Sequence, residues 1–139
     1  MKVLLDTNVV LDLLLQREPF CDDALKVFRL CEAGKVVACI TINQTTDIFY
    51  LLCRSGKPAP LAKKIVAALV NNLKTLDVNQ KDGLEALGSD MFDYEDALIA
   101  FCAKRHRVSY VITRNEKDFK LSPIKALSPI EFVSRHKFL

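Results

Sequence analysis

Four aspartates follow apolar segments that have the pattern of buried β-strands, either directly or on the next helix: Asp6, Asp47, Asp96 and Asp118. If those strands are parallel, their carboxyl ends meet at one edge of the sheet, where the ligand crevice of such folds lies. Two carboxylates about 5 Å apart repel by roughly 3 kcal/mol at an effective dielectric of about 20. A gathered set therefore needs a cation, and oxygen ligands with no histidine near them in sequence favour Mg²⁺ or Mn²⁺.

Asp6 and Asp47 each have a structural alternative. Asp6 stands between two core-forming segments, "KVLL" and "VVLDLLL", where a carboxylate is either a helix cap or a reactive group. Thr7 and Asn8 are better placed to cap the following helix, which leaves Asp6 for chemistry. Asp47 lies on an apolar helix, where an uncompensated charge is unfavourable unless the position faces solvent.

Three acids open the helix predicted over 93–106. Asp93 has the position of an N-cap, and Asp96, three residues on, completes a pattern like a capping box. Asp96 also shares a helix face with Ile99, so it can serve both as a cap and at a site. Glu95 projects about 100° away from that face and is not expected to share the site.

The elements that would position these acids alternate between strands and helices. The predicted strands are 2–5, 36–40, 74–78 and 109–113, and the predicted helices are 8–17, 19–34, 43–54, 59–73, 83–87, 93–106 and 128–136. Strands separated by helices pair in parallel through crossover connections. The sequence therefore predicts a three-layer α/β/α fold with a central parallel sheet of four to five strands, in a single domain over residues 1–139.

Composition narrows the class of protein. Half of the residues are hydrophobic and 27% are charged, which is typical of a folded globular protein. The apolar runs are too short to cross a membrane, and no signal peptide is visible. The five cysteines form no CxxC pair, which favours reduced thiols and a cytoplasmic location. With four glycines and no GxGxxG or Walker loop, a nucleotide cradle is excluded.

Other enzyme classes with similar openings do not fit. A haloacid-dehalogenase phosphatase needs a second aspartate two residues after the first, and that position is Asn8. A response-regulator receiver needs a later aspartate and a lysine after a further strand, and neither is evident. His106 and His136 lie in basic segments, so catalysis by a histidine with serine or cysteine is poorly supported. Residues 71–103 are acidic and residues 104–139 are basic, which suits a metal site beside a polyanion-binding surface or an ordinary solvated face.

Three motifs together resemble the PIN domain, a family of metal-dependent nucleases that includes the VapC-type toxins of bacterial toxin–antitoxin pairs. "LLDTNVVLDLL" is similar to the opening motif, "DALIA" to the third-acid motif, and "VITRNEKDF" to the closing pattern. The resemblance implies that Asp6 and Asp96 are metal ligands. It also matches Asp47 to a second acid that is usually glutamate, and Asn115 to a fourth that is commonly aspartate.

The resemblance implies hydrolysis of RNA phosphodiester bonds by an Mg²⁺- or Mn²⁺-dependent endoribonuclease. Asp118 would compensate in part for the charge that Asn115 lacks, and three residues would orient carboxylates or water: Thr7, Asn8 and Thr113. Phosphates of the RNA would be bound by basic residues: Lys104, Arg105, Arg107 and Arg114. The implied partners are a small antitoxin protein and a second copy of the chain, with no membrane. The alternative is a catalytically weakened PIN-like module that binds RNA or a protein.

Overall fold

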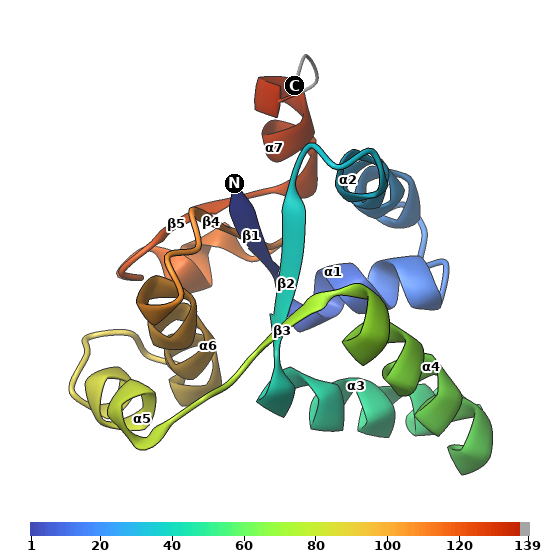
Figure 1. Ribbon diagram of the computed structural model, residues 1–139, viewed down its shortest axis with the longest axis horizontal. Helices are drawn as coiled ribbons and strands as arrows, with labels where there is room; N and C mark the ends of the chain where they lie inside the picture. The colour runs from blue at the N-terminus through green and yellow to red at the C-terminus, as the bar shows by residue number, and fades with distance from the viewer. Residues whose placement is uncertain (137–139) are drawn as a thin grey trace.

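The computed structural model describes residues 1–136 and places five parallel strands in one sheet (Figure 1). They are β1 (Lys2–Leu5), β2 (Val37–Thr41), β3 (Lys74–Leu76), β4 (Tyr110–Ile112) and β5 (Lys125–Leu127). The order β3-β2-β1-β4-β5 puts the first strand of the chain at the centre. The predicted α/β/α fold is confirmed. The strand β5 lies outside the four segments predicted as strands, but the total of five agrees with the predicted four to five.

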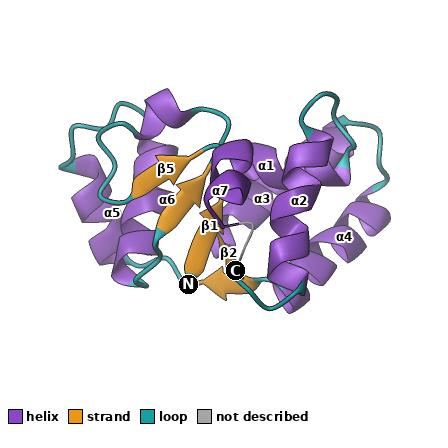
Figure 2. Cartoon of the chain, turned by 90° about the horizontal axis from the view of Figure 1, so that it is seen from above, coloured by secondary structure: helices purple, strands orange, loops and turns teal. Residues whose placement is uncertain are grey.

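Helices cover both faces of the sheet (Figure 2). The helices are α1 (Thr7–Leu14), α2 (Cys21–Glu32), α3 (Ile42–Arg54), α4 (Ala59–Asn72), α5 (Gln80–Leu87), α6 (Tyr94–Arg105) and α7 (Pro129–His136), with a 3₁₀ turn η1 at Glu116–Phe119. Core residues of α1, α2, α3, α4 and α7 share one cluster, and those of α5, α6 and η1 share the other. Within residues 1–136, no helix has the length and apolar character needed to cross a membrane.

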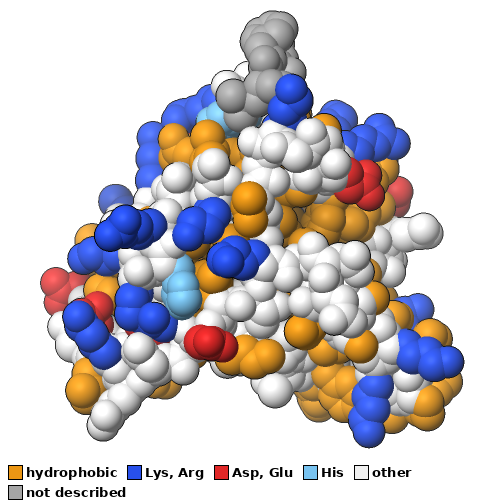
Figure 3. Space-filling view, viewed as in Figure 1, with side chains coloured by type: hydrophobic (Ala, Val, Ile, Leu, Met, Phe, Trp, Pro, Cys, Tyr) orange, Lys and Arg blue, Asp and Glu red, His pale blue; other side chains and the backbone are white. Residues whose placement is uncertain are grey.

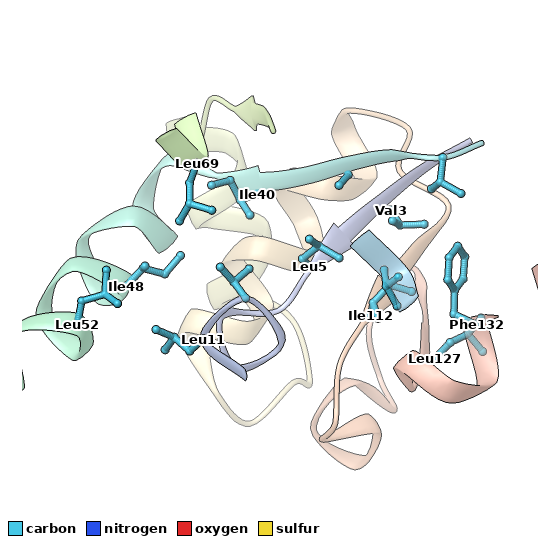
Figure 4. Close-up of a cluster of buried hydrophobic side chains, with 14 of the residues drawn as sticks. Val3, Leu5, Leu11, Ile40, Ile48, Leu52, Leu69, Ile112, Leu127 and Phe132 are labelled. Atoms are coloured by element: carbon cyan, nitrogen blue, oxygen red, sulfur yellow. The ribbon is translucent and has the colours of Figure 1, made fainter. Parts of the chain in front are cut away.

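The central strand shows why its sequence is apolar without interruption. Val3 and Leu5 belong to the cluster drawn in Figure 4, whereas Leu4 belongs to the cluster on the opposite face, and all three are fully buried. Successive strand residues point to opposite faces, so a strand covered on both sides must be apolar at every position. Burial of each such side chain contributes about 1.5–3 kcal/mol. Packing of these side chains in the core thus fixes where β1 ends, and therefore the position of Asp6, the next residue.

The parallel register puts the residues that follow β1 and β4 at one edge. Leu5 pairs with Ile112, the Asp6 N–H donates to the Ile112 carbonyl at 2.9 Å, and Thr113 follows directly. Helix α6 begins near this carboxyl edge and ends at the other, since its chain must return to the start of β4. The Lys2 ammonium marks that amino edge, where it donates to the His106 carbonyl at 2.6 Å.

Candidate active site

Asp6 lies at the carboxyl edge of the sheet and is only 7% exposed. Its Oδ1 accepts the Thr7 N–H at 2.8 Å, and its Oδ2 accepts the Thr113 hydroxyl at 2.7 Å. Asp6 is therefore itself the N-cap of α1, and the prediction that Thr7 or Asn8 takes that role is wrong. Burial raises the pKa of Asp6, an effect that the two hydrogen bonds oppose. Each oxygen keeps a further lone pair for a ligand.

Asp96 and Asp118 bring two more carboxyl groups toward Asp6. Asp96 lies in the first turn of α6, whose N-cap Asp93 accepts the Asp96 N–H at 2.9 Å, so the prediction of Asp93 as cap is confirmed. Burial raises the pKa of Asp96 to about 7, and the negative charges of Asp6, Asp93 and Asp118 add to the effect. The Asp118 charge also raises the pKa of Asp6. We call Asp6, Asp96 and Asp118 the acidic cluster.

Asp47 is joined to this region through Glu95. The two side chains lie within hydrogen-bonding reach, and this contact is the largest cause that raises the pKa of Glu95 to about 7. Burial follows, then the charge of Asp47, then those of Asp93 and Asp96. Glu95 of α6 thus meets Asp47 of α3, while the expectation that Glu95 does not share the site stays a prediction. No pattern within the sequence shows this contact between two helices.

Asn115 and Asp118 have different roles in the loop after β4. The Asn115 N–H donates to the Thr113 hydroxyl at 3.0 Å, and the Asn115 carbonyl accepts the Asp118 N–H at 3.0 Å. Asn115 is exposed and stands just before η1, so its main chain forms the turn. Asp118 brings the negative charge that acts on Asp6 and Asp96.

The three residues predicted to orient carboxylates or water differ in their contacts with Asp6. Thr113 is fully buried and connects Asp6 to the turn at Asn115, as described above. Thr7 gives Asp6 a backbone hydrogen bond. The Asn8 side-chain oxygen instead accepts a hydrogen bond from Arg17 at 3.4 Å. Of the three residues, Thr113 is therefore the one whose side chain orients the Asp6 carboxylate.

Gln44 is a buried residue that sequence reasoning missed. Its Nε2 donates to the Leu5 carbonyl at 2.8 Å and to the Thr7 hydroxyl at 3.3 Å, while its Oε1 accepts the Thr41 N–H at 2.7 Å. It thereby joins the ends of β1 and β2 on either side of Asp6. The signal that could have found it is the capping box formed by Thr41 and Gln44 at the start of α3.

Two of the predicted phosphate-binding arginines are engaged with buried carboxylates. Arg114 donates to both oxygens of Asp12, at 2.6 and 3.1 Å, and its guanidinium lies 3.8 Å over the Phe20 ring. Arg105 donates to both oxygens of Asp82, at 2.9 and 3.0 Å. We call Asp12 and Asp82 the paired carboxylates; the side chain of each is 1% exposed.

The other two predicted phosphate-binding residues lie far from the acidic cluster. Lys104 and Arg107 come at and after the end of α6, where the His106 carbonyl meets Lys2 at the amino edge of the sheet. Lys104 is eight residues beyond Asp96, a separation of about 12 Å along a helix axis. The structure therefore does not bring Lys104, Arg105 or Arg107 to the acidic cluster, because α6 runs across the full depth of the sheet.

The acidic cluster has the chemistry of a site for a hard divalent cation. Its donors are all carboxylate oxygens, which Mg²⁺ and Mn²⁺ prefer, and no ion pair within residues 1–136 neutralises any of its three members. No three His, Cys, Asp or Glu side chains of that range already form a compact metal-binding group.

Comparisons with known structures give the same fold. The chain matches a toxin–antitoxin complex from Klebsiella pneumoniae at 21% identity with a TM-score of 0.68, over 91% of this chain and 97% of that chain. It matches VapBC2 from Rickettsia felis, bound to a DNA fragment from their promoter, at 18% identity and 0.70, over 92% and 98%. It matches Mycobacterium tuberculosis VapC20, a toxin described as cleaving the Sarcin-Ricin loop, at 14% identity and 0.68, over 88% and 98%.

Comparison of the sequence with curated proteins and with family models gave different results. None of the curated proteins compared with the chain matches it. The PIN domain family, in contrast, matches over residues 2–117, a segment that runs from β1 through the turn after β4 and includes Asp6, Asp96 and Asn115. Since this match covers most of the chain, the protein belongs to the PIN domain family.

Proposed function

We propose that this protein is an Mg²⁺- or Mn²⁺-dependent endoribonuclease that hydrolyses RNA phosphodiester bonds. The observation that carries the proposal is the convergence of Asp6, Asp96 and Asp118 near the carboxyl edge of the sheet, where no ion pair within residues 1–136 neutralises them. Folding such a group together without a cation is unfavourable. The membership of the PIN domain family and the likeness to a toxin described as cleaving the Sarcin-Ricin loop support the same activity.

Asp6 and Asp96 would hold the metal, with Asp118 at the rim of the site. A bound divalent ion would supply an activated water and stabilise the charge on the departing oxygen. The protein's own contribution is orientation: the Thr113 hydroxyl and the Thr7 N–H fix both oxygens of Asp6 before any ligand arrives. Gln44 holds the strand end on which Asp6 stands.

The partners we propose are a small antitoxin protein and a second copy of the chain, in the bacterial cytoplasm. The toxin–antitoxin complexes among the structural matches support the antitoxin. Exposed apolar side chains on α5 and around the start of α6 support the dimer: Leu84, Leu87, Phe92 and Tyr94. Exposed apolar surface is common at protein interfaces. Light scattering in solution would give the mass of the assembly.

RNA cleavage titrated with Mn²⁺ tests the nuclease. Asp6→Asn removes a ligand charge at the centre of the cluster, and we expect cleavage to fall by more than about a hundredfold, since even outer-shell changes weaken metal sites about 10–100-fold. The matched control is Asp22→Asn, which removes an exposed acid from α2 and should leave cleavage unchanged.

If Asp6→Asn cleaves RNA as well as the wild type throughout the titration, the proposed mechanism fails. If neither protein cleaves RNA while both bind it, the protein is the weakened binding module that Asn115, in place of an acid, would suggest.

A further inference from the structure

Helices α1, α2, α3 and α6 end in the same backbone motif but with different residues at its critical position. In each, a residue with positive φ follows the helix, and the next N–H donates back to a carbonyl five residues earlier; at the end of α2, for example, Lys35 donates to Leu30. The positive-φ residues are Gly34 (φ 74°) after α2, Gly56 (φ 107°) after α3, Gln16 (φ 50°) after α1 and Arg107 (φ 60°) after α6. Glycine is the usual residue here because it has no Cβ to strain.

Arg107 therefore occupies a position that its backbone does not favour. The Val108 N–H donates to the Ala103 carbonyl at 3.0 Å and the Arg107 N–H to the Lys104 carbonyl at 3.0 Å, so the main chain closes the helix without help from the side chain. The Arg107 side chain is exposed, and none of the ion pairs within residues 1–136 includes it. A residue that keeps a strained backbone, while its side chain forms no ion pair within the fold, indicates that the side chain has a function outside the fold, such as binding.

The surroundings of Arg107 at the amino edge are basic. Lys2 begins β1, and its ammonium contacts the end of α6. Lys104 lies in the last turn of α6. Figure 3 shows Lys and Arg side chains gathered over the start of β1 and the end of α6. We call Lys2, Lys104 and Arg107 the basic edge.

Nearby acids do not neutralise the basic edge. Asp82 is occupied by Arg105 in a bidentate pair. The Asp77 carbonyl accepts hydrogen bonds from Arg105 and lies 3.2 Å from the His106 Nε2, so the backbone of Asp77 rather than its carboxylate is held there. Glu85 lies beside Lys104 and is paired with Lys81 at 4.0 Å. Three cations at one edge, with the exposed acids Asp77 and Glu85 beside them, leave a surface that attracts a polyanion.

We propose that the basic edge binds the phosphate backbone of RNA at a second surface, on the opposite edge of the sheet from the acidic cluster. The four residues of β1 separate the two edges by about 13 Å. RNA bound at both would be positioned by phosphate contacts at one edge and cut at the other. The choice of RNA as the polyanion rests on the proposed function.

Arg107→Gly is the decisive variant, because a structural role and a binding role predict opposite results. Glycine relieves the strain at φ 60°, so the melting temperature should stay at or above that of the parent protein. Loss of one phosphate contact to a single strand lowers the salt slope of log Kobs by about 0.7, which at about 0.1 M salt weakens binding about fivefold. Arg107→Gly combined with Lys104→Ala, which removes an exposed charge from the last turn of α6, should double the change in slope.

Binding is measured by fluorescence anisotropy with a fluorescein-labelled single-stranded RNA, in EDTA and in the Asp6→Asn background so that the RNA stays intact. Gln16→Gly makes the same backbone change without loss of charge, and Lys64→Ala removes an exposed charge from α4; neither should alter the slope. This assay measures binding and not cleavage, so it tests RNA binding at the basic edge even if the protein does not cleave RNA.

Three results would overturn the proposal. One is an unchanged salt slope in Arg107→Gly. The second is an equal loss in the two control variants. The third is a larger loss for a DNA duplex of the same sequence than for the RNA, which would assign the surface to DNA.

Discussion

Asp6 and Asp12 lie six residues apart at the start and inside of the same helix, yet their surroundings are opposite. Asp12 is bound through both oxygens by Arg114, and Arg17 lies 3.6 Å away. Asp6 receives hydrogen bonds only from neutral donors; the charge of Asp118 raises its pKa, and the charge of Arg114, which forms no ion pair with it, lowers it. Burial alone therefore does not mark a functional acid.

The same contrast separates Asp82 from Asp96 at the two ends of α6. Arg105, near the C-terminal end, lowers the pKa of Asp82 through its hydrogen bonds against the effect of burial. Near the N-terminal end, burial and neighbouring acids raise the pKa of Asp96 to about 7. An acid that the protein neutralises itself is structural, and an acid left for a cation from solution belongs to a site.

The largest expected effect is on stability, from loss of a paired carboxylate. Asp12→Asn leaves Arg114 without its buried partner, and we expect the free energy of unfolding to fall by about 3 kcal/mol. Asp6→Asn removes an unneutralised charge and should change it by less than about 1 kcal/mol. Urea unfolding in EDTA measures both. If the free energy of unfolding falls equally in the two variants, the ion pair of Asp12 does not distinguish it from Asp6 in stability.

Thr113→Val tests whether Asp6 is oriented in advance. The change keeps the shape of the side chain but removes the hydroxyl that donates to Asp6 at 2.7 Å, so Mn²⁺ affinity should fall about 10–100-fold. Isothermal titration calorimetry measures the affinity directly. Thr46→Val, which removes an exposed hydroxyl that donates to the Asn43 carbonyl on α3, is the control and should bind Mn²⁺ as the wild type does.

Asn115→Asp adds a carboxylate to the turn beside the acidic cluster. A charge at about 5 Å attracts each unit of cation charge by about 3 kcal/mol before desolvation, which offsets most of that attraction. We expect Mn²⁺ to bind about tenfold more tightly, a gain of about 1.4 kcal/mol. An unchanged affinity would indicate that Asp118 already supplies the charge that this loop can contribute.

The smallest effect is a dependence of stability on pH in metal-free buffer. Asp96 has a folded pKa of about 7 against 3.8 for the ordinary group, so the folded state binds the extra proton between those values and stability falls as pH rises through them. Asp96→Asn removes this penalty. Its melting temperature should exceed that of the wild type by a few degrees at about pH 7.5 and equal it near pH 4. A constant difference at every pH would contradict the assignment.

Local pattern was sufficient for the fold and for part of the site. The continuous apolar run in β1 and the alternation of strands and helices predicted the parallel sheet, and the family resemblance carried by "LLDTN" and "DALIA" is confirmed. Asp93 was recognised as a cap because capping depends on residues within one turn. Each of these features is written within a few neighbouring residues.

The tertiary structure alone decided which charges meet. Glu95 of α6 meets Asp47 of α3, and Arg114 meets Asp12 across 102 residues of sequence. The basic run 104–107 belongs to the amino edge because α6 traverses the sheet, although it follows Asp96 closely in the chain. Charge interactions depend on distance in space, and sequence separation fixes that distance only within a single element.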